Sequence, residues 1–128
     1  MMLITKEIRR KLERNAATPG EHAPALKLFN PCGAATWLVT EIMDDGETLF
    51  GLCDLGHQSP ELGYVSLAEL QAVRLPFGLT IERDKSFRAE HTLAAYTEAA
   101  CRAGAIVETR EALDQAAAWL KSEARTYA

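Results

Sequence analysis

Residues 36–54 read TWLVTEIMDDGETLFGLCD, and this stretch decides the fold. Two runs rich in β-branched and aromatic residues flank Asp45-Gly46, a pattern typical of a β-hairpin because glycine accepts the positive φ that a tight turn requires. With Asp45-Gly46 as a two-residue loop, the predicted pairs are Ile42 with Leu49, Glu41 with Phe50 and Trp37 with Asp54. A bulged three-residue loop would shift these partners by one residue.

Both faces of the predicted hairpin are largely apolar. Alternation places on one face Leu38, Thr40, Ile42, Leu49, Gly51 and Cys53, and on the other Trp37, Val39, Glu41, Phe50, Leu52 and Asp54. A strand pair without a polar face is covered on both sides. We therefore expect the hairpin to lie in the centre of its sheet.

The segment before the hairpin predicts an amphipathic helix. Ile4, Ile8 and Leu12 recur every four residues, and Thr5 is placed to cap a helix over residues 6–14. The segment after the hairpin contains a capping box, Ser66-Leu67-Ala68-Glu69, which predicts a second helix after Ser66. Further short strands are expected at residues 25–29, 62–65 and 79–83.

The last forty residues are rich in alanine and predict a pair of helices. Thr92 and Thr109 are the expected N-caps, and Gly104 ends the first helix. Ile106-Val107 could instead add a short edge strand between them. The apolar stripe of the second helix comprises Leu113, Ala116, Ala117, Leu120 and Ala124, with Trp119 at its edge.

These elements predict an α+β fold. It consists of a small antiparallel sheet with a central hairpin (36–43/47–54), an N-terminal helix, a helix after Ser66 and a C-terminal helical pair. We place a core domain at residues 1–90 and a helical extension at 91–128, which either packs on the core or serves self-association as a homodimer.

Composition and charge restrict the classes of function. The chain has 128 residues and a net charge of −4, with three cysteines, and it contains no long apolar stretch that would form a signal or a membrane span. We therefore expect one cytoplasmic domain without membrane contact. Residues 28–73 contain no Lys or Arg and seven acids: Glu41, Asp44, Asp45, Glu47, Asp54, Glu61 and Glu69.

An acidic block of this kind repels nucleic acid phosphates and suits a basic protein surface. We predict partner contacts at four of its residues: Asp44, Asp45, Glu47 and Asp54. The alternative is that each of them is a solvated turn acid. Nucleic acid is expected to bind only weakly, through Arg9, Arg10 and Arg14 on the first helix.

No complete catalytic set is recognisable, and we predict no catalytic residue, metal or cofactor. Glu41 and Asp54 would lie about 13 Å apart along the hairpin, too far for a carboxylate pair. Glu41 on an apolar face would have a raised pKa if covered. The candidate functional residues are Glu41, His57, Glu61 and Tyr64; a hydrolase or nucleic-acid-processing enzyme built on the first three is the alternative function.

Several motifs resemble a domain-of-unknown-function family of small bacterial proteins carried on plasmids and phages. The motifs are TWLVTE at residues 36–41, PELGYVSLAEL at 60–70 and IERD at 81–84, and the resemblance covers about residues 3–87. It implies no catalytic residues. Its setting favours an accessory protein of a mobile element, a class that includes proteins that interfere with host defence. Together with the charge, it predicts a non-catalytic acidic interaction module.

Overall fold

The computed structural model describes residues 2–127 of the chain, with side chains described through residue 124. Its helices are α1 (Lys6–Ala17), α2 (Leu67–Ala72), the 3-10 turn η1 (Pro76–Gly78), α3 (Leu93–Ala103) and α4 (Arg110–Tyr127). Its strands are β1 (Leu26–Phe29), β2 (Thr36–Ile42), β3 (Thr48–Asp54), β4 (Glu61–Ser66) and β5 (Glu82–Arg83).

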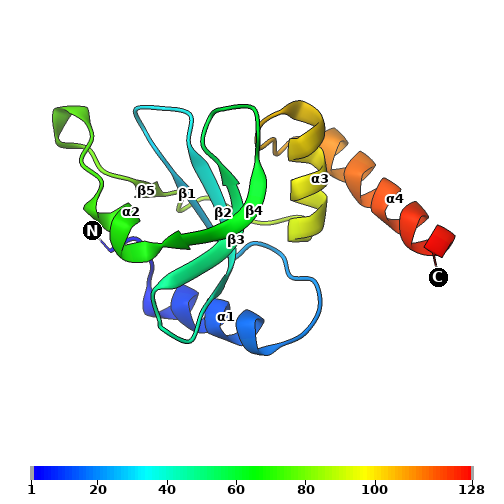
Figure 1. Ribbon diagram of the computed structural model, residues 1–128, viewed down its shortest axis with the longest axis horizontal. Coiled ribbons are helices and arrows are strands. Elements are labelled where there is room, and N and C mark those ends of the chain that lie inside the picture. The colour runs from blue at the N-terminus through cyan, green and yellow to red at the C-terminus, as the bar shows by residue number, and fades with distance from the viewer. Residues whose placement is uncertain (1, 128) are drawn as a thin grey trace.

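The five strands form one antiparallel sheet in the order β4-β3-β2-β1-β5, with helices around it (Figure 1). This arrangement confirms the predicted α+β fold with its hairpin inside the sheet. Among the described residues, no helix is long and apolar enough to cross a membrane.

The hairpin contains a β-bulge at Thr40 that the sequence did not reveal. Near the turn, Ile42 pairs with Leu49 and Glu41 with Phe50, as predicted. Beyond the bulge, Trp37 pairs with Cys53 and not with Asp54, so the prediction for that end was wrong. The extra residue in β2 shifts every later partner by one.

The bulge also exchanges the two faces of β2. Trp37 and Val39 pack in the same cluster as Ile42 and Leu49, whereas Leu38 packs with Leu52 on the other side. The predicted faces were therefore right for β3 and for the turn end of β2. They were wrong for residues 37–39, because an inserted residue inverts the alternation of a strand.

Two features hold the bulge in place. The Thr40 carbonyl accepts a hydrogen bond of 2.9 Å from the Asn15 side chain of α1. Gly51, opposite Val39, leaves room for the displaced backbone, since a Cβ there would lie 2.0 Å from the Leu38 carbonyl oxygen. The bulge thus depends on a helix far away in sequence and on a glycine across the strand.

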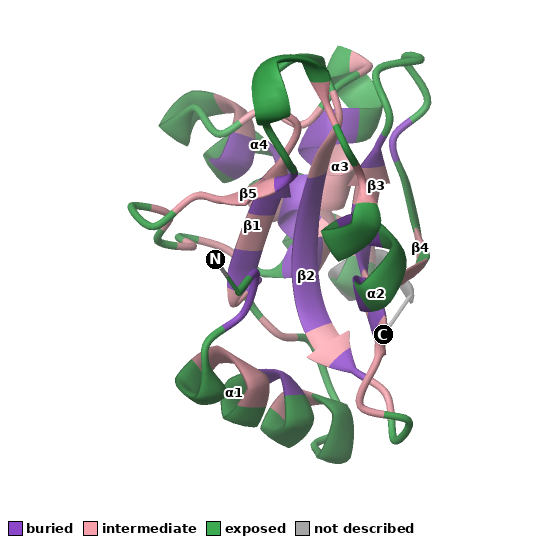
Figure 2. Cartoon of the chain, turned by 90° about the vertical axis from the view of Figure 1, so that its left-hand side faces the viewer, coloured by how far each residue is buried: buried purple, intermediate pink, exposed green. Residues whose placement is uncertain are grey.

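We call the side of the sheet beneath α1 and α2 the closed face. Its core is built by residues of the N-terminal segment, α1, β1–β3 and α2: Leu3, Ile4, Leu12, Leu26, Leu28, Trp37, Val39, Ile42, Leu49, Leu67, Leu70 and Ile81. Figure 2 shows β2 buried along most of its length between the flanking elements.

We call the opposite side the cleft face. Its core joins Leu38 and Leu52 of the sheet to buried residues of α3 and α4, among them Tyr96, Ala100 and Leu113. The burial of α3 makes it part of the sheet's own core, so a boundary at residue 90 would separate it from the face that it covers. In α4 the burial decreases along the helix, from Leu113 to the exposed Ala124, and Figure 1 shows its C-terminal end leaving the body.

The predicted helix caps are confirmed, with one difference. Thr5, Ser66 and Thr92 each accept a hydrogen bond from a backbone N–H three residues on, at 3.1–3.4 Å. The capping box was expected to use Glu69 as its second acceptor. Glu47 takes that part, since its carboxylate accepts bonds from the Ser66 hydroxyl at 2.5 Å and the Ala68 N–H at 2.7 Å.

Two predicted strands differ in the structure. The strand expected at residues 79–83 is reduced to Glu82–Arg83, because the 3-10 turn at Pro76–Gly78 directs the chain away from the sheet. Ile106-Val107 forms no strand in the described chain. Both side chains pack against the core of the cleft face instead.

Candidate functional site

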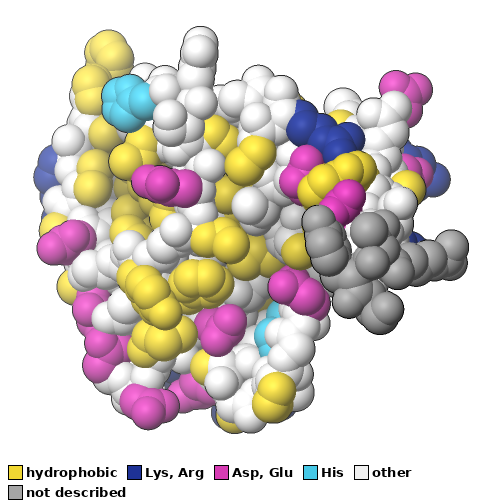
Figure 3. Space-filling model, turned by 45° about the vertical axis from the view of Figure 1, so that its right-hand side comes forward, with side chains coloured by type: hydrophobic (Ala, Val, Ile, Leu, Met, Phe, Trp, Pro, Cys, Tyr) yellow, Lys and Arg dark blue, Asp and Glu magenta, His cyan; other side chains and the backbone are white. Residues whose placement is uncertain are grey.

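A cleft of about 360 Å³ lies on the cleft face, where α3 leaves the turn end of the sheet uncovered. Figure 3 shows hydrophobic side chains gathered there, with acidic side chains among and around them. The residues used below come from the loop before β1, the three strands β2–β4, and both C-terminal helices: Glu21, His22, Glu41, Phe50, Leu62, Glu98, Cys101 and Leu120.

The floor of the cleft is apolar. Phe50 of β3 and Leu62 of β4 line it, and Leu120 of α4 lines it from the helical side. Tyr64, a predicted candidate, lies beside Phe50 with ring centroids 5.0 Å apart and planes tilted by 55°. Leu62 and Tyr64 are 47% and 67% exposed, so this surface offers apolar area to a ligand.

Three carboxylates line the cleft, and they differ in their partners. Glu98 forms an ion pair of 2.8 Å with Arg102, whose guanidinium lies over the Trp119 ring. Glu21 accepts a weak hydrogen bond of 3.3 Å from the Ala94 N–H. Glu41 is half-buried and has no hydrogen-bond or ion-pair partner among the side chains that the structure describes.

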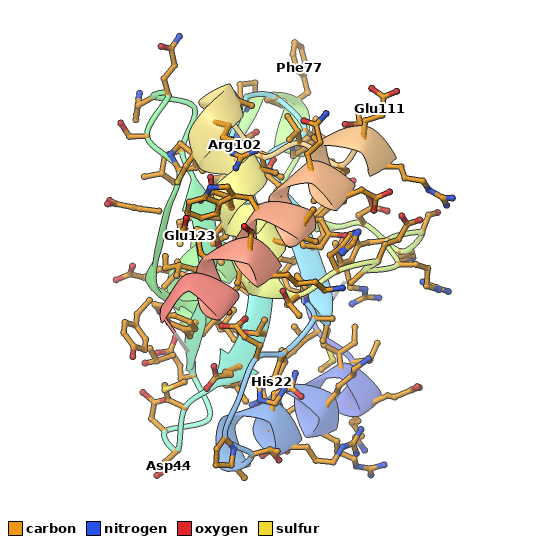
Figure 4. The ribbon with its side chains drawn as sticks, turned by 90° about the vertical axis from the view of Figure 1, so that its right-hand side faces the viewer. His22, Asp44, Phe77, Arg102, Glu111 and Glu123 are labelled. Carbon is orange, nitrogen blue, oxygen red and sulfur yellow. The ribbon has the colours of Figure 1, made fainter. Side chains whose placement is uncertain are left out.

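His22 closes the end of the cleft next to α1. Its Nε2 lies 2.7 Å from the Thr18 carbonyl oxygen, so this nitrogen must carry the proton. Its own carbonyl accepts a bond of 2.9 Å from the Leu93 N–H at the start of α3. Figure 4 shows His22 below the C-terminal half of α4, with Asp44 at the tip of the hairpin. The loop thus ties α1 to α3.

The residues proposed for an enzyme do not come together. His57 is exposed in the loop after β3, away from the residues of the cleft. Glu61 pairs with Cys53, three residues from the Phe50 that faces Glu41, or about 10 Å along the strand. An odd number of residues also puts Glu61 on the opposite face of the sheet.

Asp54, one of the four residues predicted to contact a partner, is engaged inside the protein. It is only 4% exposed, and its carboxylate accepts bonds of 2.9 Å from the N–H groups of Gly56 and Ile106. Burial and these two bonds give it a structural role: it joins the end of β3 to the segment before α4. Its carboxylate does not face the surface.

The hairpin acids are also partly engaged. The Thr48 hydroxyl and the N–H groups of Thr48 and Glu47 donate to Asp45, and these bonds lower the pKa of Asp45. Glu47 caps α2, as described above. Asp44 is exposed at the tip. The seven acids of the middle segment are therefore distributed over both faces, the hairpin tip, α2 and β4, and do not form one continuous patch.

The basic residues of α1 are likewise partly engaged inside the protein and partly exposed. Arg9 donates to the Gly46 carbonyl at 2.8 Å, whereas Arg10 and Arg14 are exposed. A separate groove between α1 and the segment after β5 is also lined by cations, including Lys11, Lys85 and Arg88. The predicted weak contact with nucleic acid stays a prediction.

No group of three or more potential ligands in the described residues could hold a metal ion. All three cysteines are free thiols, with Cys32 and Cys101 exposed and Cys53 half-buried. Burial, and secondly the Glu61 carboxylate, raise the pKa of the Cys53 thiol. A raised pKa is the opposite of what a nucleophilic cysteine requires.

The sequence analysis named Glu41 and Tyr64 as candidates and paired Phe50 with Glu41, but it did not indicate the other walls of the cleft. Glu21 and His22 lie in an irregular loop, and Glu98 and Leu120 lie on helices that were placed outside the core domain. Periodicity could have indicated that Glu98 and Cys101 share a helix face. It could not have indicated which strand that face meets.

A family model described as a protein of unknown function (DUF2958) matches residues 3–107. The chain belongs to the DUF2958 family. The match extends beyond the segment in which the resemblance was recognised. It contains the whole sheet together with α1, α2 and α3, and it ends before α4. Neither the curated proteins nor the solved structures give a significant match to this DUF2958 protein.

Proposed function

We propose that this DUF2958 protein is a non-catalytic interaction module that binds a basic, partly apolar segment of another protein in the cleft. The observation that carries the proposal is Glu41, a half-buried carboxylate that has no partner among the side chains described through residue 124 and is set beside the apolar floor. A Lys or Arg of the bound segment would supply the missing ion pair. Apolar side chains beside it would cover Phe50 and Leu62.

The energetics of the cleft favour a ligand that carries both a positive charge and apolar side chains. A half-buried ion pair is screened less by solvent than a pair on the surface, so Glu41 gains more from a cation than the exposed acids do. Glu98 adds negative potential, although Arg102 offsets its charge. The apolar floor supplies most of the area, and the carboxylate selects the charge of the partner.

The resemblance to plasmid- and phage-borne proteins supports a partner from the host cell. A basic segment of a host-defence protein has the chemistry that the cleft selects. In this proposal the protein acts by occupying that segment, as an accessory protein of a mobile element. The enzymatic alternative with Glu41, His57 and Glu61 has less support, because Glu41 and Glu61 lie on opposite faces of the sheet and His57 lies in the loop after β3.

Binding of designed peptides tests this function. The probes are fluorescein-labelled peptides with alternating leucine and lysine, and the same peptides with glutamate in place of lysine, measured by fluorescence anisotropy. We expect the lysine peptide to bind and Glu41→Gln to weaken it at least about tenfold, since a partly buried ion pair is lost. Added salt should weaken it as well.

Glu61→Gln is the matched control, because it removes the same charge from an exposed position outside the cleft. It should leave peptide affinity within about twofold of the unmodified protein. Equal losses for the two variants, or equal binding of the glutamate peptide, would contradict the proposed site.

A further inference from the structure

The two edges of the sheet differ in length. β5 has two residues, whereas β4 has six and no strand beyond it (Figure 2). Edge strands expose unpaired N–H and C=O groups, and natural proteins protect them by shortness, charge or proline. β5 is protected by its length. Within β4 the only charged residue is Glu61, at its first position.

The register shows which backbone groups of β4 point outward. The Leu67 N–H donates to the Glu47 carbonyl at 3.0 Å, so this pair is a hydrogen-bonded pair of the ladder between β3 and β4. Because such pairs alternate, odd-numbered residues of β4 bond to β3 and even-numbered residues point away. Leu62 and Tyr64 thus present both an N–H and a C=O to the outside. Ser66 presents only its N–H, because its C=O accepts the first backbone hydrogen bond within α2.

Within the described chain, no steric constraint requires a glycine at position 63. Its φ is not positive, and a Cβ built on it would meet nothing within 4 Å. Gly51, which pairs with it, could not accept a Cβ at all. A glycine inside a strand reduces stability and often marks the close approach of another backbone. Within the described chain no other backbone approaches Gly63 that closely.

We propose that two copies of the chain pair through β4, antiparallel, about a two-fold axis at Gly63. In this register Leu62 of each copy exchanges both backbone hydrogen bonds with Tyr64 of the other. Ser66 lies opposite Pro60, which is buried and whose carbonyl already accepts from the Cys101 thiol of α3 at 4.0 Å, so the pairing rests on Leu62 and Tyr64. The four backbone hydrogen bonds between Leu62 and Tyr64 of the two copies carry the pairing.

The side chains are also complementary in this register. Leu62 lies opposite Tyr64 of the second copy on the cleft face, and both are exposed in one copy alone. On the closed face Glu61 lies opposite Val65, so no carboxylate faces a carboxylate. The two glycines occupy the pair at the axis, where Cα atoms approach to about 4.5 Å.

A second copy fits this edge better than continued stacking of strands. Two-fold pairing uses the β4 edge of both copies, and only the short β5 edges remain. The assembly therefore closes as a dimer and does not extend into a fibre. An axis perpendicular to the sheet leaves both clefts on the same side, with their floors continuous through Leu62 and Tyr64.

Sedimentation velocity over a concentration series tests the dimer. We expect the unmodified protein to dimerise and Gly63→Glu to weaken dimerisation at least about tenfold, because it places two carboxylates opposite each other at the axis. Gly63→Ala is the graded variant and should weaken dimerisation less than Gly63→Glu, because it adds two methyl groups at the axis but no charge. Should Gly63→Glu fail to fold by circular dichroism, Tyr64→Pro takes its place, since it removes an outward N–H and leaves the bonds to β3 intact.

Three results would overturn the proposal, two of them from the unmodified protein and the β4 variants and one from a variant of α4. One is a monomer at every concentration of the unmodified protein, and another is a dimer that persists in both Gly63→Glu and Tyr64→Pro. Trp119→Ala, which changes the 42% exposed tryptophan of α4, tests the helical pair as a dimer surface; loss of the dimer in this variant would also contradict pairing through β4.

The dimer is independent of the proposed cleft function. Glu41→Gln should leave dimerisation unchanged, and Gly63→Glu should still bind the lysine peptide. Salt separates the two further: it should strengthen association between two copies of charge −4 and weaken binding of a basic peptide.

Discussion

The two faces of the central sheet are built from the same strands, yet one is closed and the other is partly open. The closed face is covered by α1, α2 and the N-terminal segment, and its sheet residues lie in a continuous core. The cleft face is covered by α3 and α4 over Leu38 and Leu52, whereas Glu41 and Phe50 remain accessible. The difference shows that accessible apolar and acidic side chains of the sheet gather at the turn end of the cleft face.

The bulge at Thr40 produces this difference. Without it, Trp37 and Val39 would share a face with Glu41 and would fill the cleft face with large apolar side chains. With it, both contribute to the closed core, and Leu38 lies beneath α3. An uncovered area with one carboxylate is left at the turn end.

Replacing the glycine opposite the bulge should have the largest effect. In Gly51→Ala the new Cβ would lie 2.0 Å from the Leu38 carbonyl oxygen, so the backbone of β2 must move. We expect a loss of about 4 kcal/mol in the free energy of unfolding, above the usual range for overpacking. Urea denaturation measures it, and Gly63→Ala is the control at an open position. A loss below about 1 kcal/mol for Gly51→Ala would show that the bulge does not need the glycine.

The same substitution on the two faces should give different losses. Leu49→Ala removes a fully buried side chain from the closed face, and we expect a loss of about 3 kcal/mol in unfolding free energy. Leu62→Ala removes a 47% exposed side chain from the cleft floor and should cost less than about 1 kcal/mol. Equal losses in chemical denaturation would mean that the cleft floor is as covered as the core.

Thiol reactivity should show the smallest difference, in rate and not in stability. Cys101 lines the cleft and is exposed, whereas Cys53 lies on the closed face, where burial and then Glu61 raise its thiol pKa. A raised pKa leaves less thiolate at neutral pH, so iodoacetamide should modify Cys101 first. Mass spectrometry of the Cys32→Ser variant follows the two sites. Both should react alike in urea; faster reaction of Cys53 in the folded protein would reverse the assignment of the faces.

The features that could be predicted from the sequence are those set by neighbouring residues. Thr5, Ser66 and Thr92 accept bonds from amides three residues away, and the hairpin turn also forms locally. The predicted two-residue loop at Asp45-Gly46 was wrong in length, because the Met43 N–H bonds to the Thr48 carbonyl and the Gly46 N–H to the Met43 carbonyl, so the loop spans residues 44–47. The bulge could not be predicted, since it depends on Asn15 and Gly51, which lie 25 residues before and 11 after Thr40 in sequence. The cleft has the same limitation, because its walls come from six separate elements or loops.

The acidic segment shows a second limit. Counting charges found seven acids without a base, but it could not distinguish a free carboxylate from one with internal donors. Asp54 bonds to an N–H 52 residues away, and Glu47 caps a helix 19 residues on. Glu41 differs from these two because no such donor reaches it in the described side chains, and it differs from the exposed Asp44, Glu61 and Glu69 because it is half-buried. Charge in the sequence thus indicated a region, and hydrogen bonding together with burial selected the residue.

The bulge has a consequence for how β2 can change over generations. A substitution in β2 alters one side chain, but a single-residue deletion or insertion before Glu41 alters the phase of every residue on one side of it. Removing Thr40 would return the strand to plain alternation and exchange the surroundings of residues 37–39. β2 should therefore accept substitutions more readily than insertions or deletions.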